Sequence, residues 1–537
     1  MQRQNAVILA GVLISLMIVL VGASLAPGAF FVGKHEGDMF HLLQVLFRME
    51  HGQLPHEDFV TPIGVLAFAP IVVFLKAGFG VGKAFLLGQA LVAVAFFPAV
   101  WWVSASRFRG GWAYLFGAGV MVLLLALVHG TVEPSISPSM HYNRWAWAAA
   151  FLALASAILP GQGRAHALAD GIVIGLALSV MALTKVTFFA AFAVPILVAL
   201  VGRGALRTGV WAVLTGLVVI AGVTMMMGPT YWTGYLSDLL VVSGSIVRPQ
   251  PGMSLKDVIS APSHLVGTAV LILSVVLLRQ AERGLEGLVL LLLVPGFLYV
   301  TWQNSGNDPQ WLALLGMLLW MLRPTREIHN AIGWDMQKGV GMAALAALVL
   351  AAPSFINMAW SPFRHLNVNP AGYAAVLPDQ PRHADLRVAT LRNHRADAKI
   401  PLDGAGSMLA RDDVPARVEA TTFMGEELAN CTLGLGMAHW FATIAADLKS
   451  SGLVDGQSLF TTDVLSSFWL FGASDPLPGG APWYYGGLSG FENADLVLVP
   501  LCPISAKLRK VMLADIAATD TLLAEVRRTE LYILYRK

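Results

Sequence analysis

Two pairs of carboxylates stand close together in the first polar stretch of this chain. Glu36 and Asp38 flank Gly37, and Glu57 and Asp58 follow in the same stretch, after which the sequence turns apolar again. Carboxylates at the edge of an apolar segment are costly to place and usually have a function. A carboxylate within hydrogen-bond reach can take the proton that a hydroxyl loses as it attacks an electrophilic carbon. These positions indicate either a general base beside a membrane or a loop that is merely solvated.

The elements that must position these carboxylates are apolar. Hydrophobic residues make up 56% of the 537 residues, charged residues only 13%, and the mean hydropathy is +0.66. Soluble domains carry about 25% charged residues, so the composition predicts a polytopic α-helical membrane protein. The net charge of +2 and the lack of basic runs exclude nucleic acid as an expected partner.

Hydropathy predicts about eleven transmembrane helices in residues 1–356. The first apolar run, from Ala6 to about Ala26, is long for a signal peptide, so we expect an uncleaved first helix. The other predicted spans are 84–105, 110–128, 145–160, 168–184, 186–202, 208–227, 265–279, 285–302, 309–322 and 338–356.

One further run, from Pro62 to about Phe79, decides the topology. It contains Gly64, Pro70 and Lys76, which fit a surface element better than a span. If it stays outside, as part of a first periplasmic loop over 27–83, the loops after residue 84 place ten Lys and Arg residues in the cytoplasm and four outside. This bias is the expected one. We therefore predict a cytoplasmic N-terminus in the bacterial inner membrane.

Under this topology the outer loops collect the polar residues that are candidates for substrate binding. They are His141, Tyr142, Asn143, Arg144, Lys185, Arg248, Asn304 and Asn307. Arg and Lys suit the charge of a leaving phosphate, which identifies Arg144, Lys185 and Arg248 as candidate phosphate ligands. The alternative for Arg144 and Lys185 is that they only extend to the membrane interface. A divalent metal held by acidic and histidine residues of the first loop also remains open.

The character of the sequence changes after Pro353. We expect an irregular linker over 357–400 and a periplasmic soluble α/β domain over 401–537. The final segment, TLLAEVRRTELYILYRK, is expected to form a helix and then a closing strand. Cys431 and Cys502 are the only cysteines; an oxidising periplasm permits their pairing, which the sequence leaves undecided.

Three features together resemble the GT-C superfamily of membrane glycosyltransferases, of the mannosyltransferase or aminoarabinose-transferase type. The first is Glu36-Gly37-Asp38 after an N-terminal span. The second is G-x-L-P-x-x-D-F-x-x-P-x-G over Gly52 to Gly64, and the third is GIVIGLALSVMALTKVTFF, which contains Lys185. The resemblance covers about the first 200 residues. It departs from the family at Pro55-His56-Glu57-Asp58, where the family often has Pro-Tyr-x-Asp, and at Tyr142-Asn143-Arg144, where many relatives have an acidic residue.

This resemblance implies an inverting transfer of a sugar from a polyprenyl phosphate to a glycan, lipid or protein acceptor of the cell envelope. It makes Asp38 the catalytic base, with Glu36 beside it, and gives Asp58 to an accessory acidic motif that shapes the substrate-binding loop. It implies no definite cofactor and leaves a divalent metal open. The alternatives are a transporter or lipid flippase with a periplasmic accessory domain, an O-antigen-type ligase, and a sensor or assembly scaffold.

Overall fold

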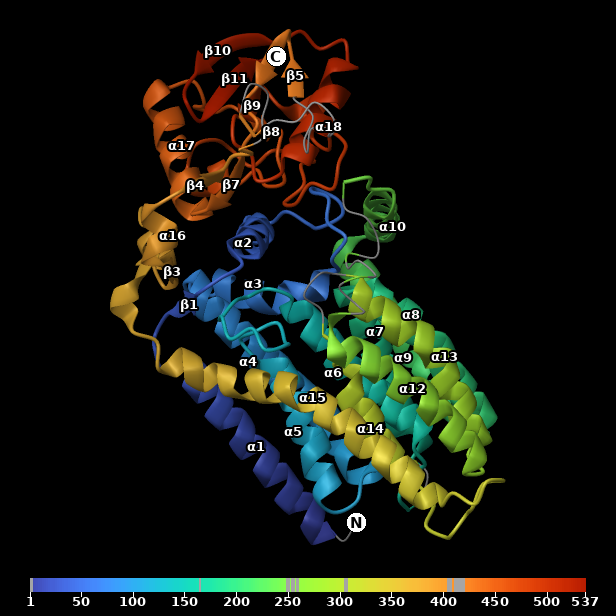
Figure 1. Cartoon of the computed structure of the whole chain (residues 1–537). Coiled ribbons are helices and arrows are strands. Elements are labelled where there is room, and N and C mark those ends of the chain that lie inside the picture. The colour runs from blue at the N-terminus through green and yellow to red at the C-terminus, as the bar shows by residue number, and fades with distance from the viewer. Residues whose placement is uncertain are drawn as a thin grey trace.

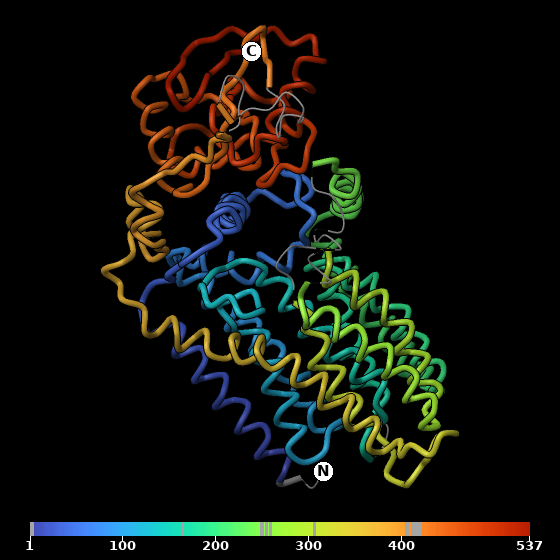
Figure 2. The backbone as a smooth tube through the Cα atoms, in the orientation of Figure 1, coloured from blue at the N-terminus to red at the C-terminus, as the bar shows by residue number. Residues whose placement is uncertain are grey.

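The molecule has a long helical bundle at one end and a smaller sheet-containing domain at the other (Figure 1). The computed structural model describes residues 3–163, 166–247, 252, 256, 260–303, 308–402, 408–409 and 421–537. Helix α2 (Glu36–Glu50) lies between the bundle and the domain, and α10 (Thr230–Ser243) lies on the other side of the molecule, at the end of the bundle nearest the domain. The N-terminus lies at the end of the bundle far from the domain, as the tube in Figure 2 also shows.

Each of the eleven predicted apolar runs is helical over most of its length. These helices are α1 (Arg3–Leu25), α4 (Val81–Arg107), α5 (Gly111–Leu125), α6 (His141–Ile158), α7 (Ala167–Thr184), α8 (Val186–Gly202), α9 (Leu206–Met227), α12 (Pro262–Gln280), α13 (Gly284–Trp302), α14 (Trp311–Leu322) and α15 (Met336–Leu366). By length and composition, seven of the described helices can cross a membrane: α1, α4, α7, α9, α12, α13 and α15. The chain is therefore a multi-pass membrane protein.

The run over 62–79 does not form a long helix. It contains a 3-10 turn, η1 (Val65–Ala67), followed by α3 (Ala69–Lys76), which has eight residues. At 1.5 Å per residue such a helix is about 12 Å long, whereas the hydrocarbon core of a bilayer is about 30 Å thick. This segment packs beside α2 and α4.

The segment expected to be an irregular linker is largely regular. Helix α15 continues to Leu366, ten residues beyond the predicted end of the membrane module. The chain then forms β2 (Tyr373–Ala375), β3 (Leu386–Ala389), α16 (Thr390–His394) and β4 (Asp397–Lys399). Strand β3 pairs with β2 and, in parallel, with β1 (Phe30–Val32), which directly follows α1. This pairing joins the first outer loop to the beginning of the C-terminal part.

The C-terminal domain contains a four-stranded mixed sheet with the order β10-β11-β9-β8. In chain order, the regular elements of this domain, with the four strands of the sheet included, are β5 (Thr421–Phe423), β6 (Glu426–Leu428), β7 (Thr432–Leu435), α17 (Met437–Ser451), β8 (Leu459–Thr461), η4 (Phe468–Phe471), η5 (Phe491–Asn493), β9 (Leu496–Pro500), α18 (Ala506–Ala517), β10 (Ala524–Arg528) and β11 (Tyr532–Arg536). The prediction of a helix within TLLAEVRRTELYILYRK is wrong, because β10 and β11 form an antiparallel hairpin there. Cys431 and Cys502 are joined by a disulfide, with their Cα atoms 4.9 Å apart.

Two hydrophobic cores organise the molecule. One fills the helical bundle. The second is shared, because buried side chains of α2 and α3, such as Phe40 and Ile71, belong to the same cluster as Phe441, Val497 and Ile533 of the C-terminal domain. The carboxylate-bearing helix is thus packed against the C-terminal domain as well as the bundle.

Candidate active site

Asp38 lies in the first turn of α2 and contacts the second outer loop. The hydroxyl of Ser139 donates a hydrogen bond to Asp38 Oδ2, and Ser139 is buried. Ser139 lies two residues before the start of α6, so this contact joins the first turns of two helices. A hydrogen bond from a fixed donor holds a carboxylate in one orientation, as a general base requires.

Both helices that meet at this contact begin at a residue with left-handed backbone. His35, the N-cap of α2, has a φ of 66°, and Met140, the N-cap of α6, has a φ of 55°. Non-glycine residues rarely adopt this conformation, and such strain concentrates at functional sites. The backbone on either side of the Asp38–Ser139 contact is therefore the part of the outer face to examine for chemistry.

Glu36 holds α2 to the C-terminal part of the chain. It accepts a hydrogen bond from the backbone N–H of Met437 at 3.1 Å and lies 3.8 Å from the guanidinium of Arg392. Burial raises the pKa of this carboxyl group. The structure therefore separates the two acidic residues: Asp38 contacts the membrane module, and Glu36 contacts α17 and α16.

Two adjoining cavities share the side chain of Tyr142. The first is lined by Asp38, His41, Leu42, Phe68, Pro138, Ser139, Met140, His141 and Tyr142, and has a volume of about 10 Å³, enough for a single water. The second, of about 150 Å³, is lined by Pro62, Ile63, Tyr142, Lys185, Val186, Thr187, Leu239, Val242, Ser243, Tyr299, Gln303 and Tyr485. Lys185 Nζ lies 5.6 Å from the centroid of the Tyr142 ring. Tyr142 thus lines both the cavity that contains Asp38 and the cavity that contains Lys185.

Lys185 lies in the short connection between α7 and α8, and the first outer loop packs closely against it. The backbone N–H of Gly64 donates to the Thr184 carbonyl at 3.1 Å. A Cβ atom at residue 64 would collide with the Leu183 carbonyl oxygen, so only glycine permits this approach. This contact brings the loop that follows Asp58 to the wall of the Lys185 cavity.

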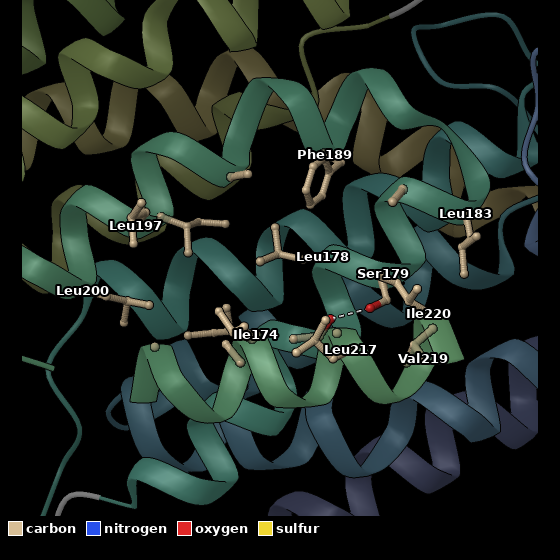
Figure 3. Close-up of a pocket in the computed structure, with 18 of the residues that line it drawn as sticks. Ile174, Leu178, Ser179, Leu183, Phe189, Leu197, Leu200, Leu217, Val219 and Ile220 are labelled. Atoms are coloured by element: carbon tan, nitrogen blue, oxygen red, sulfur yellow. Dashed lines mark hydrogen bonds between the residues drawn. The ribbon is translucent and has the colours of Figure 1, made fainter. Parts of the chain in front are cut away.

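An apolar groove lies along the helices that meet at Lys185. It has a volume of about 410 Å³ and is lined by side chains of α7, α8 and α9, among them Leu178, Phe189 and Leu217 (Figure 3). The hydroxyl of Ser179 in this groove donates to the Gly175 carbonyl at 2.9 Å. The groove is therefore suited to a hydrocarbon chain.

The predicted residues of the second outer loop are buried at the beginning of α6. His141 contacts the carbonyl oxygens of Ala67, at 2.8 Å, and Pro138, at 3.2 Å, while it also lines the Asp38 cavity. Asn143 is 4% exposed. Arg144 is fully buried, and its guanidinium donates to the carbonyls of Ala126 and Val128, both at 2.7 Å. Arg144 therefore satisfies backbone groups after α5 and does not line the Lys185 cavity.

The remaining predicted site residues fall into two groups. The carboxylate of Asp58 accepts a hydrogen bond from the backbone N–H of Leu54 at 2.6 Å, which closes its own loop. Arg248, Asn304 and Asn307 lie outside the described residues.

The second outer loop is fixed by the far end of α15. Asn357 donates to the carbonyls of Thr131, at 3.1 Å, and Glu133, at 2.9 Å, and the Ser361 hydroxyl accepts from the Leu127 N–H at 2.8 Å. Asn357 and Ser361 lie beyond the predicted end of this helix. Their contacts hold the loop that carries Ser139.

The electrostatic surroundings of Asp38 include two imidazole rings. His35 and His129 pack edge to face with their centroids 5.1 Å apart, and burial lowers the pKa of both, that of His129 to about 4. Glu133 is held in the carboxylate form, because hydrogen bonds from Lys34 and Ser135 lower its pKa to about 2. Within the described part of the chain, no three His, Cys, Asp or Glu side chains are grouped as a metal site requires.

Sequence reasoning missed the side chains with which the C-terminal domain covers α2. The Gln44 amide donates to Ser467 Oγ at 3.0 Å and to the Pro482 carbonyl at 2.9 Å. The Trp483 ring packs against His41 with a centroid separation of 5.7 Å, and Tyr485 lines the Lys185 cavity. The only sequence signal was the aromatic run Trp483-Tyr484-Tyr485 between glycine-rich turns, which carried no indication of its distant partner.

No protein-family model, curated protein or solved structure matches this chain.

Proposed function

We propose that this chain is an inverting glycosyltransferase that takes a sugar from a polyprenyl phosphate at the outer face of a membrane. One observation carries the proposal: Asp38 and Lys185 line two cavities that share Tyr142, and the Lys185 turn joins two of the helices that form the apolar groove. A base, a cation and a hydrocarbon groove in this order match the acceptor, phosphate and lipid tail of such a reaction.

In the proposed reaction Asp38 takes the proton of the acceptor hydroxyl as that oxygen attacks the anomeric carbon. The bond from this carbon to the phosphate oxygen breaks, and the polyprenyl phosphate leaves with the bonding electron pair. Lys185 stabilises the negative charge on the phosphate. Ser139 acts as a positioning residue for Asp38. The Asp38 cavity holds about one water, so the acceptor requires a movement of the residues that line it, such as those of the second outer loop.

The proposal includes eleven spans, a cytoplasmic N-terminus and a periplasmic C-terminal domain in a bacterial inner membrane. The Cys431–Cys502 disulfide supports an oxidising environment for this domain. The short α3 and the distribution of Lys and Arg support the same orientation.

The orientation is tested by cysteine labelling. Both native cysteines are in the disulfide, so a cysteine introduced at exposed Lys76 is the only reactive thiol. It should react with a membrane-impermeant maleimide on intact cells, whereas Lys338→Cys, at the start of α15, should react only after permeabilisation. The opposite labelling pattern would overturn the orientation.

The catalytic proposal is tested by Asp38→Asn in the full-length protein. Transfer from a panel of synthetic polyprenyl-phosphate hexoses and pentoses to cell-envelope extract is expected to fall about 100-fold or more, because the amide is not basic. The matched control is Asp520→Asn, an exposed carboxylate of the C-terminal domain. Wild-type transfer by a folded Asp38→Asn protein would refute the role of Asp38.

A further inference from the structure

A second polar cavity lies at the opposite end of the helices that bear Lys185. It has a volume of about 120 Å³ and is lined by Ser106, Arg107, Ser156, Gly161, Gln162, Gly163, His166, Asp170, Leu200, Arg203, Ala205 and Thr208. Helix α7 begins beside it, has 18 residues and ends at Thr184. At 1.5 Å per residue the cavity is about 27 Å from the Lys185 turn, so the two sites are distinct.

Two arginines and one carboxylate provide the charge of this cavity. Arg107 Nη2 lies 2.6 Å from Asp170 Oδ2, and the Trp102 indole donates to Asp170 Oδ1 at 2.9 Å. Arg203 Nη1 donates to the carbonyls of Ala157, at 2.7 Å, and Leu159, at 2.9 Å, at the end of α6. Since Asp170 balances one guanidinium, the lining side chains keep a net positive charge with the histidine neutral.

Two buried donors at this cavity have no partner among the described residues. They are Arg107 Nε and Ser156 Oγ, in side chains of residues that are 5% and 2% exposed. Buried polar groups are nearly always hydrogen-bonded, so these two require an acceptor that is not part of the described chain. Gly161 lies against the guanidinium, where a Cβ atom would be 3.1 Å from Arg107 Nη1.

Two helix N-termini also meet at the cavity. His166 is the N-cap of α7 and Ala205 is the N-cap of α9, and neither side chain accepts a hydrogen bond from the first turn of its helix. Each N-terminus has a positive partial charge and unpaired backbone N–H groups, which favour an anion. The two helices, the two arginines and the unpaired donors therefore require the same kind of ligand.

We propose that this cavity binds a phosphate group. Its volume admits one phosphate, and guanidinium forks and helix N-termini are the groups that recognise phosphate oxygens. Because the cavity lies at the ends of apolar helices, the phosphate has two sources: the headgroup of an anionic lipid, or inorganic phosphate from solution. A bound phosphate would tie the ends of α4, α6, α7, α8 and α9 together, and the proposal does not depend on glycosyl transfer.

Thermal unfolding of the full-length protein tests the site in two arms. One arm adds inorganic phosphate in neutral detergent at constant ionic strength, with chloride as the reference. The other compares nanodiscs of phosphatidylcholine with nanodiscs that also contain phosphatidylglycerol. A ligand that binds only the folded protein raises the unfolding temperature. A rise with phosphate assigns the site to free phosphate, and a rise with phosphatidylglycerol alone assigns it to a lipid headgroup.

Variants distinguish this site from general effects of anions. Ser156→Ala removes one unpaired donor with little change in packing and should raise the midpoint concentration of the ligand about tenfold or more, since a hydrogen bond to a charged group is involved. Arg203→Gln should weaken binding further. Arg207, in the first turn of α9, is an exposed cation, so Arg207→Gln is the control and should leave the midpoint unchanged. The proposal is overturned if neither arm stabilises the protein, or if Ser156→Ala and Arg203→Gln keep the wild-type midpoint.

Discussion

Replacement of Lys185 by glutamine separates a phosphate ligand from a lysine that only reaches the membrane interface. Lys185 is buried and lines a cavity with Tyr142, which also lines the Asp38 cavity, and it lies between α7 and α8, two of the helices that form the apolar groove. Glutamine keeps most of the length and polarity of the side chain and removes its charge. We expect the Lys185→Gln protein to fold and to lose transfer.

The expected magnitude follows from the loss of one charged donor at a leaving oxyanion. Such a donor contributes about 2.7–4 kcal/mol to the transition state, which corresponds to a loss of about 100-fold to 1,000-fold in kcat. A lysine at the interface that makes no contact with the phosphate would change the rate by less than about fivefold, because an exposed charge contributes under about 1 kcal/mol.

Arg144 gives the contrasting result, although the sequence assigned it the same role. Its guanidinium donates to two buried backbone carbonyls, and Arg144→Gln leaves at least one of them without a donor. Each unsatisfied buried group costs about 1–3 kcal/mol, so this variant should unfold at a lower temperature. Its folded fraction should retain a near-normal affinity for polyprenyl phosphate.

The assay uses polyprenyl phosphate, the common product, so that the identity of the sugar is not needed. Its binding is measured from the shift in unfolding temperature for wild type, Lys185→Gln, Arg144→Gln and the exposed control Lys76→Gln. Weaker binding only in Lys185→Gln supports the assignment. If Lys185→Gln binds as wild type and Arg144→Gln binds poorly in a fully folded state, the reasoning from the cavities is refuted.

Two further predictions concern stability. The pKa of Glu133 is lowered to about 2, so its carboxylate stabilises the folded protein at pH values above 4.5, the ordinary pKa of the group, and this stability is lost as the pH falls toward 2. Glu133→Gln should therefore narrow the difference between the unfolding temperatures at pH 6 and at pH 3. An unchanged difference would contradict the Lys34 contact. The Cys431–Cys502 disulfide joins residues 71 apart, so the double variant Cys431→Ala, Cys502→Ala should lower the free energy of unfolding of the C-terminal domain by about 4 kcal/mol in denaturant titrations. Equal stability of the wild-type protein with and without reductant would show that the bond does not form.

The helices of the bundle were predictable because each depends on its own residues. A run of about 20 apolar residues is sufficient to specify a membrane helix, whatever its neighbours. The hairpin at the C-terminus was not predictable in this way. Glu525 and Arg528 of β10 form an ion pair that is equally compatible with a helix, and the strand exists because β11 offers it an edge. Tertiary pairing overrides local preference in such cases.

Only part of the candidate site could be predicted for the same reason. Charged residues beside spans identified Asp38 and Lys185, which the structure brings to adjoining cavities. The same signal selected Arg144, because sequence does not distinguish a cation that caps backbone carbonyls from one that lines a cavity. Ser139 gave no signal, since a serine in a polar loop is common and its partner is 101 residues away.

The shared core changes what the predicted boundary between the membrane module and the C-terminal part of the chain means. The change in composition marks the end of the membrane-spanning part, but the apolar face of α2 is buried by the domain beyond that boundary, through contacts such as Phe40 with Phe441 at 5.0 Å between centroids. Gln44 and Glu36 add hydrogen bonds across the same contact. Asp38 is therefore held from both sides, by Ser139 of the membrane module and, through α2, by the C-terminal domain. The C-terminal domain is in this sense part of the candidate active site, because the orientation of α2 depends on it.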